Sequence, residues 1–79
     1  MTKVIERLPA VSARTGLSPS SIYKQIRLGL FPKGTKLTTR ATGWDHDEVS
    51  KWIEVKLRGA SDSEITEFVF NLEKERLLK

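Results

Sequence analysis

The 79-residue chain contains no cysteine, a single histidine and no long apolar run. Without thiols it can form neither a disulfide framework nor a thiolate metal site, and one imidazole, that of His46, cannot supply the usual ligands of a metal centre. No stretch approaches the roughly 18 apolar residues of a membrane span, and the N-terminus lacks a signal-peptide core. We therefore expect one small cytoplasmic domain that is stabilised by packing, without a cofactor or a membrane partner.

Acidic residues are missing between Leu8 and Trp44. The formal net charge of the whole chain is +4, which alone is a weak indication of a polyanionic partner. Its distribution is more informative, because a surface that docks on phosphates must be free of carboxylates. The basic residues of this acid-free stretch are Arg14, Lys24, Arg27, Lys33, Lys36 and Arg40.

The first helix is expected to begin near Leu8 and to end at Gly16. Proline is tolerated in the first helical turn, where Pro9 lies, because its missing N–H would be unpaired there anyway. Glycine supplies the left-handed backbone conformation that commonly ends helices.

The second helix has a sharper start. Ser18 is a favoured N-cap residue and Pro19 suits the first helical position. Ile22 and Ile26 form an apolar stripe, so we expect a helix over residues 18–28. Two short helices joined by a tight turn are typical of the helix-turn-helix motif, in which the first helix braces the second.

The next segment predicts a two-stranded hairpin. Pro32 and Gly34 exclude a continued helix, and the threonines that follow favour extended backbone. We expect strands at Thr35–Thr38 and Thr42–Trp44, with Arg40 at or near the tip.

Two further helices follow the hairpin. Asp45 and Glu48 have the spacing of a capping box ahead of an amphipathic stretch that reaches Leu57. Ser61 and Glu64 repeat that pattern ahead of the last helix. The indoles of Trp44 and Trp52 occupy positions that face the predicted core, so we expect them to be structural.

The last helix carries more apolar residues than one buried face accommodates. Phe68, Val69 and Phe70 are consecutive, and three neighbours on a helix span too wide an arc to point the same way. Either the helix crosses the domain with part of its apolar surface exposed, or this surface mediates self-association. The sequence leaves both alternatives open.

The outward positions of the second helix are the best candidates for a binding site. A polar helix face is most often simply solvated. In a helix-turn-helix, however, the front of the second helix enters the major groove, where serine permits close approach and lysine or arginine binds phosphate or guanine. The candidate DNA-binding residues on this helix are Ser18, Ser20, Ser21, Tyr23, Lys24 and Arg27.

The predicted hairpin supplies further basic residues. Lys33 and Lys36 are candidates for contacts with the DNA backbone, and Arg40 is a candidate for the backbone or a narrow minor groove. For Tyr23, packing beside Ile26 and contact with a phosphate are about equally expected. The histidine and its flanking aspartates do not form a hydrolytic site, because no oxyanion hole or sheltered cleft accompanies them, and we expect no enzymatic activity.

Residues 7–53 resemble the AlpA family of prophage regulatory proteins. This likeness covers well over half of the chain without an evident gap. The shared residues are Arg7-Leu8-Pro9, Thr15-Gly16-Leu17-Ser18, Ser21-Ile22-Tyr23, Gly29, Phe31-Pro32, Lys36-Leu37, Arg40-Ala41, Gly43-Trp44, Glu48-Val49 and Trp52-Ile53.

The resemblance implies a winged helix-turn-helix, related to phage excisionases and to the DNA-binding part of MerR-type regulators. It places residues 18–28 on the recognition helix and residues 35–44 in the wing. Thr38-Thr39 departs from the glycine-proline turn that the family usually has, and the segment from Gly59 onward lies beyond the shared region.

Together these patterns predict a mainly α fold with a small β-hairpin wing, a winged helix-turn-helix with an additional C-terminal helix. The expected units are residues 1–58, which bind DNA, and residues 59–79, which pack on that domain or mediate oligomerisation. We expect a sequence-specific regulator of transcription that binds double-stranded DNA, with a homodimer or a higher oligomer on DNA as a possible form. The alternatives are an excisionase-like factor that assists a recombinase or integrase, and a protein-interaction module that acts through the last helix.

Overall fold

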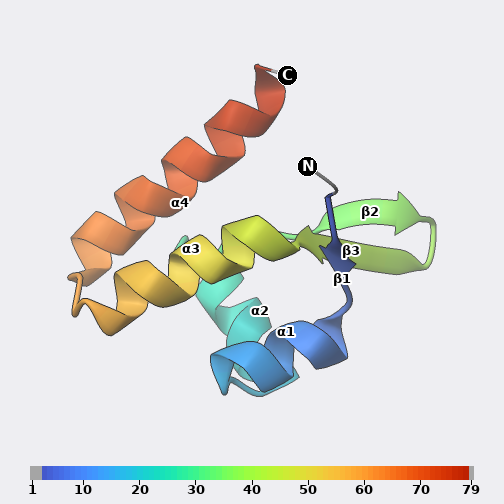
Figure 1. Cartoon of the computed structure of the whole chain (residues 1–79), viewed down its shortest axis with the longest axis horizontal. Coiled ribbons are helices and arrows are strands. Elements are labelled where there is room, and N and C mark those ends of the chain that lie inside the picture. The colour runs from blue at the N-terminus through green and yellow to red at the C-terminus, as the bar shows by residue number, and fades with distance from the viewer. Residues whose placement is uncertain (1–2, 79) are drawn as a thin grey trace.

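The computed structural model describes residues 3–78, which form four helices and a small antiparallel sheet (Figure 1). This mainly helical fold confirms the expected class and is compatible with a winged helix-turn-helix. The elements in chain order are β1 (Ile5–Glu6), α1 (Leu8–Thr15), α2 (Pro19–Arg27), β2 (Thr35–Thr38), β3 (Ala41–Asp45), α3 (His46–Leu57) and α4 (Asp62–Leu77).

The α1–α2 pair follows the predicted turn signals. Gly16 ends α1 with a φ of 74°, a left-handed conformation that side chains disfavour. The Ser18 hydroxyl caps α2 by accepting a hydrogen bond from the Ser21 N–H at 3.2 Å. The helix ends at Arg27, one residue earlier than expected, with Leu28 as its C-cap.

The sheet has three strands in the order β1-β3-β2, so the expectation of a two-stranded hairpin was incomplete. Strand β1 pairs with β3 through Ile5 opposite Asp45 and Glu6 opposite Trp44. Two residues are too few to show an alternating pattern, which is why the sequence did not predict this strand. Strand β3 is also longer by one residue at each end than the predicted Thr42–Trp44.

Gly43 lies on the middle strand of this sheet, and side chains from both outer strands pack over it. A Cβ atom at Gly43 would lie 2.5 Å from Cγ2 of Ile5 and 2.9 Å from Cδ1 of Leu37. Those side chains come from β1 and β2, on either side of β3. The missing side chain therefore lets them approach each other over the sheet.

Both tryptophans lie in the core, as predicted, and each indole N–H is satisfied. The indole of Trp44 donates to the carbonyl oxygen of Pro32 at 2.9 Å, and that of Trp52 donates to the carbonyl oxygen of Leu30 at 2.8 Å. Phe31, which is fully buried between these two acceptors, contacts Trp52 edge to face with ring centroids 4.8 Å apart. The segment between α2 and the wing is thus fixed to the core at three successive residues.

The caps of the last two helices differ. Asp45 caps α3 by accepting from the Asp47 N–H at 2.8 Å, but the predicted capping box is wrong, because the Glu48 carboxylate pairs with Arg76 instead. At the start of α4 the predicted capping box is confirmed. There the Ser61 N–H donates to the carboxylate of Glu64 at 2.9 Å, and the Glu64 N–H donates to the hydroxyl of Ser61 at 3.2 Å.

Helix α4 runs alongside α3 on the side away from α1 (Figure 1). Ile65, Val69 and Leu72 are buried at the spacing of one helix face. Phe68 is partly buried against the core, whereas the side chain of Phe70 is 65% exposed. One stripe of α4 therefore belongs to the core and another faces outward.

Candidate DNA-binding surface

Helix α2 presents a continuous exposed row opposite its buried Ile22. Ser20, Tyr23, Lys24 and Arg27 are all exposed, and their spacing of three, one and three residues puts them along one side of the helix. The side chain of Tyr23 is 43% exposed and does not belong to the core cluster. A serine, a phenol and two cations thus share one solvent-facing surface.

The three serines at the front of α2 are not equivalent. The Ser18 hydroxyl accepts from the Ser21 N–H and donates to the Ser21 hydroxyl at 3.0 Å. These two side chains satisfy each other and fix the first turn of the helix. Ser20 lies 3.3 Å from the Ser18 hydroxyl and faces solvent, so its side chain is the one at this end that a ligand meets first.

Within the described residues, the cations of α2 have no ion-pair partner. No carboxylate belongs to α2, and within residues 3–78 neither Lys24 nor Arg27 forms an ion pair or a side-chain hydrogen bond. Their charges remain available to a polyanion. The backbone N–H groups at the start of α2 add positive potential at the same surface.

The wing carries its two cations on exposed positions. Arg40 lies in the tight turn between β2 and β3, as predicted, and its N–H donates to the Thr38 hydroxyl at 3.2 Å. Lys36 lies on β2 opposite Thr42, and its side chain is exposed.

Lys33 lies just before the wing, and its main chain is held by α4. Its N–H donates to the Glu73 carboxylate at 3.0 Å and its carbonyl accepts from Arg76 at 3.1 Å. The ammonium group stays exposed. The structure therefore places Lys33 beside α4 as well as near the wing, a position that the sequence did not reveal.

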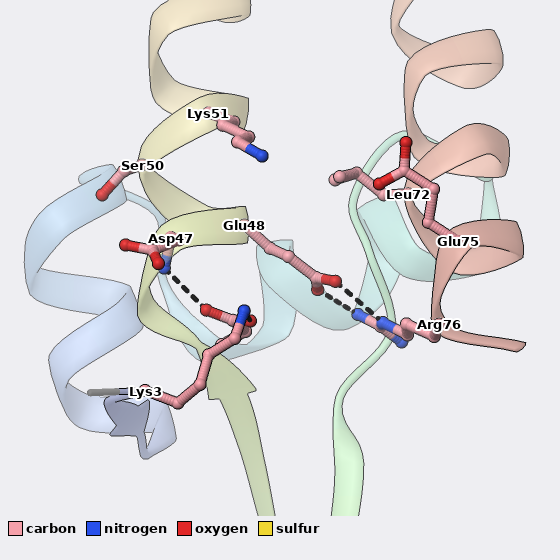
Figure 2. Close-up of a pocket in the computed structure, with 9 residues that line it drawn as sticks. Lys3, Asp47, Glu48, Ser50, Lys51, Leu72, Glu75 and Arg76 are labelled. Carbon is pink, nitrogen blue, oxygen red and sulfur yellow. Dashed lines mark hydrogen bonds and ion pairs between the residues drawn. The ribbon is translucent and has the colours of Figure 1, made fainter. Parts of the chain in front are cut away.

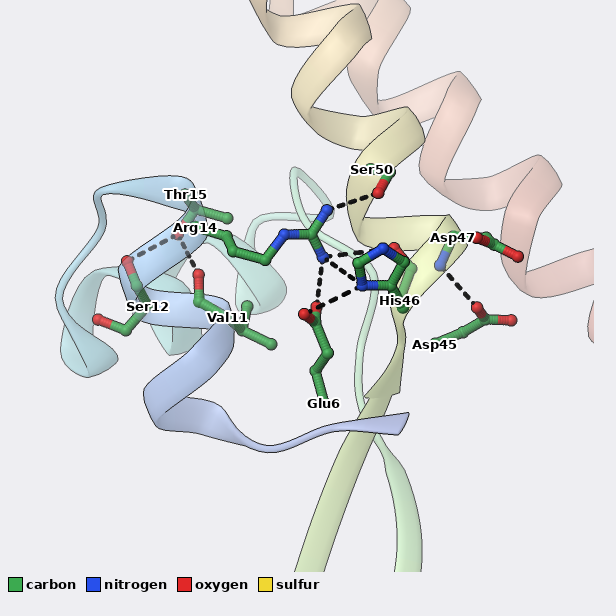
Figure 3. A network of polar contacts seen from close by, with 9 residues as sticks. All are labelled: Glu6, Val11, Ser12, Arg14, Thr15, Asp45, His46, Asp47 and Ser50. Atoms are coloured by element: carbon green, nitrogen blue, oxygen red, sulfur yellow. Dashed lines mark hydrogen bonds and ion pairs between the residues drawn. The ribbon is translucent and has the colours of Figure 1, made fainter. Parts of the chain in front are cut away.

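Arg14, the first cation of the acid-free stretch, points into the protein (Figure 3). Its guanidinium donates to the carboxylate of Glu6 and to the hydroxyl of Ser50, each at 2.5 Å, and lies 3.1 Å from Nδ1 of His46. The Glu6 side chain is only 10% exposed. Arg14 therefore joins β1, α1 and α3 and does not belong to the exposed basic surface.

A cleft lies between α3 and the end of α4, and none of its lining residues belongs to α2 (Figure 2). It has a volume of about 580 Å³, and its charged lining residues are the acids Asp45, Asp47, Glu48 and Glu75 and the bases Lys3, Lys51 and Arg76. Arg76 neutralises Glu48 there, and the hydrogen bond between them raises the pKa of the guanidinium. The four carboxylates are nearly balanced by the three cations, and Lys3 and Arg76 pair with Asp45 and Glu48, so the cleft does not add to the basic surface.

Two classes of site are not found in the described part of the chain. Within residues 3–78 no three histidine or acidic side chains come together as metal ligands. Over the same residues, no helix has both the length and the apolar character that crossing a bilayer requires.

The family comparison matches residues 4–57 to the model of the prophage CP4-57 regulatory protein (AlpA). The chain belongs to the AlpA family. The part that matches the AlpA model runs from just before β1 to the end of α3, so the whole exposed basic surface lies inside it and α4 lies outside it.

A relative of this AlpA-family chain is the "Uncharacterized protein ORF88" of Enterobacteria phage P4. The two are 40% identical over 53 residues, which are 67% of this chain and 60% of the phage protein. The chain thus spans less than two thirds of the length of that relative. The comparison with solved structures gave no significant match.

Proposed function

We propose that this AlpA-family chain binds double-stranded DNA sequence-specifically and regulates transcription in a prophage or mobile element, without catalysing a reaction. The observation that carries the proposal is the exposed row of Ser20, Tyr23, Lys24 and Arg27 on α2. Helix α2 is the second helix of a helix-turn-helix, the position whose N-terminal half contacts base edges in the major groove. Membership in a family of prophage regulatory proteins supports the same function.

In this proposal the residues of α2 divide into two groups. Ser18 and Ser21 build the helix front, because their hydroxyls bond to each other and to the backbone. Ser20 and Lys24 face the groove, where short and long polar side chains meet base edges. Arg27 lies one turn further on and binds the backbone phosphate or guanine acceptors.

The wing binds the flanking DNA backbone in the same complex. Arg40 at the tip and Lys36 on β2 are exposed and lie on the element that follows the recognition helix in the chain. Contacts of this kind set the register of a protein on DNA and contribute most of the salt dependence of binding. DNA binding of this kind takes place in the bacterial cytoplasm, on the nucleoid.

The test is the double substitution Lys24→Ala with Arg27→Ala. It should weaken binding to the target site roughly 10- to 100-fold and flatten the log-log salt dependence by about one unit per lost phosphate contact. Fluorescence anisotropy over a series of salt concentrations measures both quantities.

A matched control removes one lysine and one arginine at the end of α3. Lys56→Ala with Arg58→Ala makes the same change in net charge at exposed positions outside α2 and the wing. This control should retain most of the affinity. Equal losses in the two variants would show that net charge alone drives binding and would rule out α2 as the recognition helix.

A further inference from the structure

Helix α4 carries an apolar stripe that no part of residues 3–78 covers. Phe70 is 65% exposed and Leu77 is 84% exposed, and their separation of seven residues places them on one side of the helix. A groove of about 450 Å³ runs beside them and is lined by Lys33, Glu73 and Lys74 as well. The exposed surface of this groove is mainly apolar, which distinguishes it from scattered exposed leucines.

Two unpaired charges lie along one flank of this stripe. Glu67 precedes Phe70 by three residues and Lys74 follows it by four, so both lie on the same flank, seven residues apart. Both are exposed, and neither forms an ion pair within residues 3–78. The charged residues in the first half of α4 are all acidic, namely Asp62, Glu64 and Glu67.

A second copy of the same helix complements this pattern if it runs in the opposite direction. When two identical helices pack antiparallel about a two-fold axis near Phe70, the same flank of each helix meets the other. Glu67 of each copy then faces Lys74 of the second copy, which gives two symmetric ion pairs. In a parallel pair the like charges would lie level with each other, and the helix dipoles would also be aligned unfavourably.

The apolar residues fit the same arrangement. The Phe70 rings of the two copies meet near the axis, where aromatic pairs pack favourably. Leu77 of each copy falls over the first turns of the second helix, where Ser63 and Thr66 are small and exposed. The groove beside Lys33 leaves room for these side chains.

We propose that the chain forms a homodimer through antiparallel pairing of the α4 helices, with Phe70 at the centre and Glu67–Lys74 pairs on either side. This interface uses none of the exposed row on α2. Dimerisation therefore goes beyond the proposed DNA binding and does not depend on it. Its consequence for a DNA-binding protein is a pair of recognition helices related by two-fold symmetry.

Charge reversal tests the pairing, with sedimentation velocity of the DNA-free protein as the measurement. Glu67→Lys alone and Lys74→Glu alone should each raise the dissociation constant of the dimer about tenfold, because each creates two like-charge contacts. The variant that carries both substitutions should return to within about threefold of the wild type, since the pairs are restored with exchanged signs.

Two further variants separate the interface from general effects. Glu75→Lys makes the same charge change at an exposed position on a different side of α4 and should leave dimerisation unchanged. Phe70→Ala removes the apolar centre and should shift the protein to monomer. Thermal unfolding of each variant establishes that it is folded.

Three outcomes would overturn the proposal. The first is a wild-type chain that stays monomeric at about 1 mM. The second is a dimer that neither single charge reversal weakens, which would place the interface elsewhere. The third is a double variant that dimerises no better than the singles, which would rule out the Glu67–Lys74 pairs.

Discussion

At the scale of single residues, Arg14 stabilises the junction between β1, α1 and α3. Its guanidinium bridges the carboxylate of Glu6 and the hydroxyl of Ser50, and its Nη1 lies beside the imidazole of His46 (Figure 3). Glu6 is mostly buried, so the hydrogen bond from Arg14 replaces water as a partner of its carboxylate. Arg27, in contrast, is exposed on α2 and has no such partner within residues 3–78.

Arg14→Leu should therefore lower the free energy of unfolding by about 2 kcal/mol, because it removes charged hydrogen bonds and leaves the mostly buried Glu6 carboxylate with only the imidazole of His46 as a side-chain partner among residues 3–78. Arg27→Leu should change it by less than about 0.5 kcal/mol, as is usual for exposed positions. Urea denaturation measures both. Equal stabilities of the two variants would contradict the structural role of Arg14.

These two arginines also show how far the sequence alone predicts the site. The acid-free stretch indicated a basic surface, and the cap and stripe of α2 placed Lys24 and Arg27 on its outer face. The same acid-free stretch also contains Arg14, and nothing in the stretch itself distinguishes this partly buried arginine from the exposed ones. Its partners His46 and Ser50 lie more than thirty residues away in the chain, and side-chain pairs at such separations leave no periodic signal.

At the scale of elements, the junction of β3 and α3 depends on Asp45. Its carboxylate caps α3 through the Asp47 N–H and accepts from the Lys3 ammonium at 2.8 Å. Partial burial acts to raise the pKa of Asp45, but the hydrogen bonds from Lys3 and Asp47 outweigh it and hold the pKa below its ordinary value. The ionised carboxylate is therefore the form that stabilises the fold.

A pH series tests this role. Because the pKa of folded Asp45 is lowered, its contribution to stability is complete above the unfolded value of 3.8 and is lost as the pH falls through the folded value. Asp45→Ala should cost about 1 kcal/mol at pH 7, and this difference from the wild type should shrink below about pH 4. Thermal unfolding at several pH values measures the difference, and one that stays constant down to pH 2 would contradict this role.

Local signals predicted the elements well, and long-range pairing explains the errors. Turn glycines, helix-start prolines and serine caps affect only the backbone within about four residues of themselves. Helices α1 and α2 and the capping box of α4 were therefore predictable from the sequence. Strand β1 exists only because β3 is beside it. Glu48 left its predicted capping role because Arg76, 28 residues later, competes for the carboxylate.

At the scale of the whole molecule, the exposed basic surface is separate from the cleft of mixed charge. Within residues 3–78 the cations of α2 and the wing form no ion pairs, whereas the cleft between α3 and α4 combines four carboxylates with three cations (Figure 2). This distribution favours one orientation on a polyanion, in which α2 and the wing approach the phosphates and the nearly balanced cleft does not. Helix α4 lies beyond the AlpA match and supplies the surface that we assign to dimerisation.

The most direct test of the central claim is selection of bound fragments from the source genome, with the wild type and the Lys24→Ala, Arg27→Ala variant in parallel. A bound site ahead of a gene would identify a regulator of transcription, and clustered direct repeats at an attachment site would identify an excisionase-like factor. In either case, sequence-specific binding through α2 predicts that wild-type fragments share a common sequence and that the variant loses this enrichment. Wild-type fragments without a common sequence, or the same enrichment with the variant, would contradict the account.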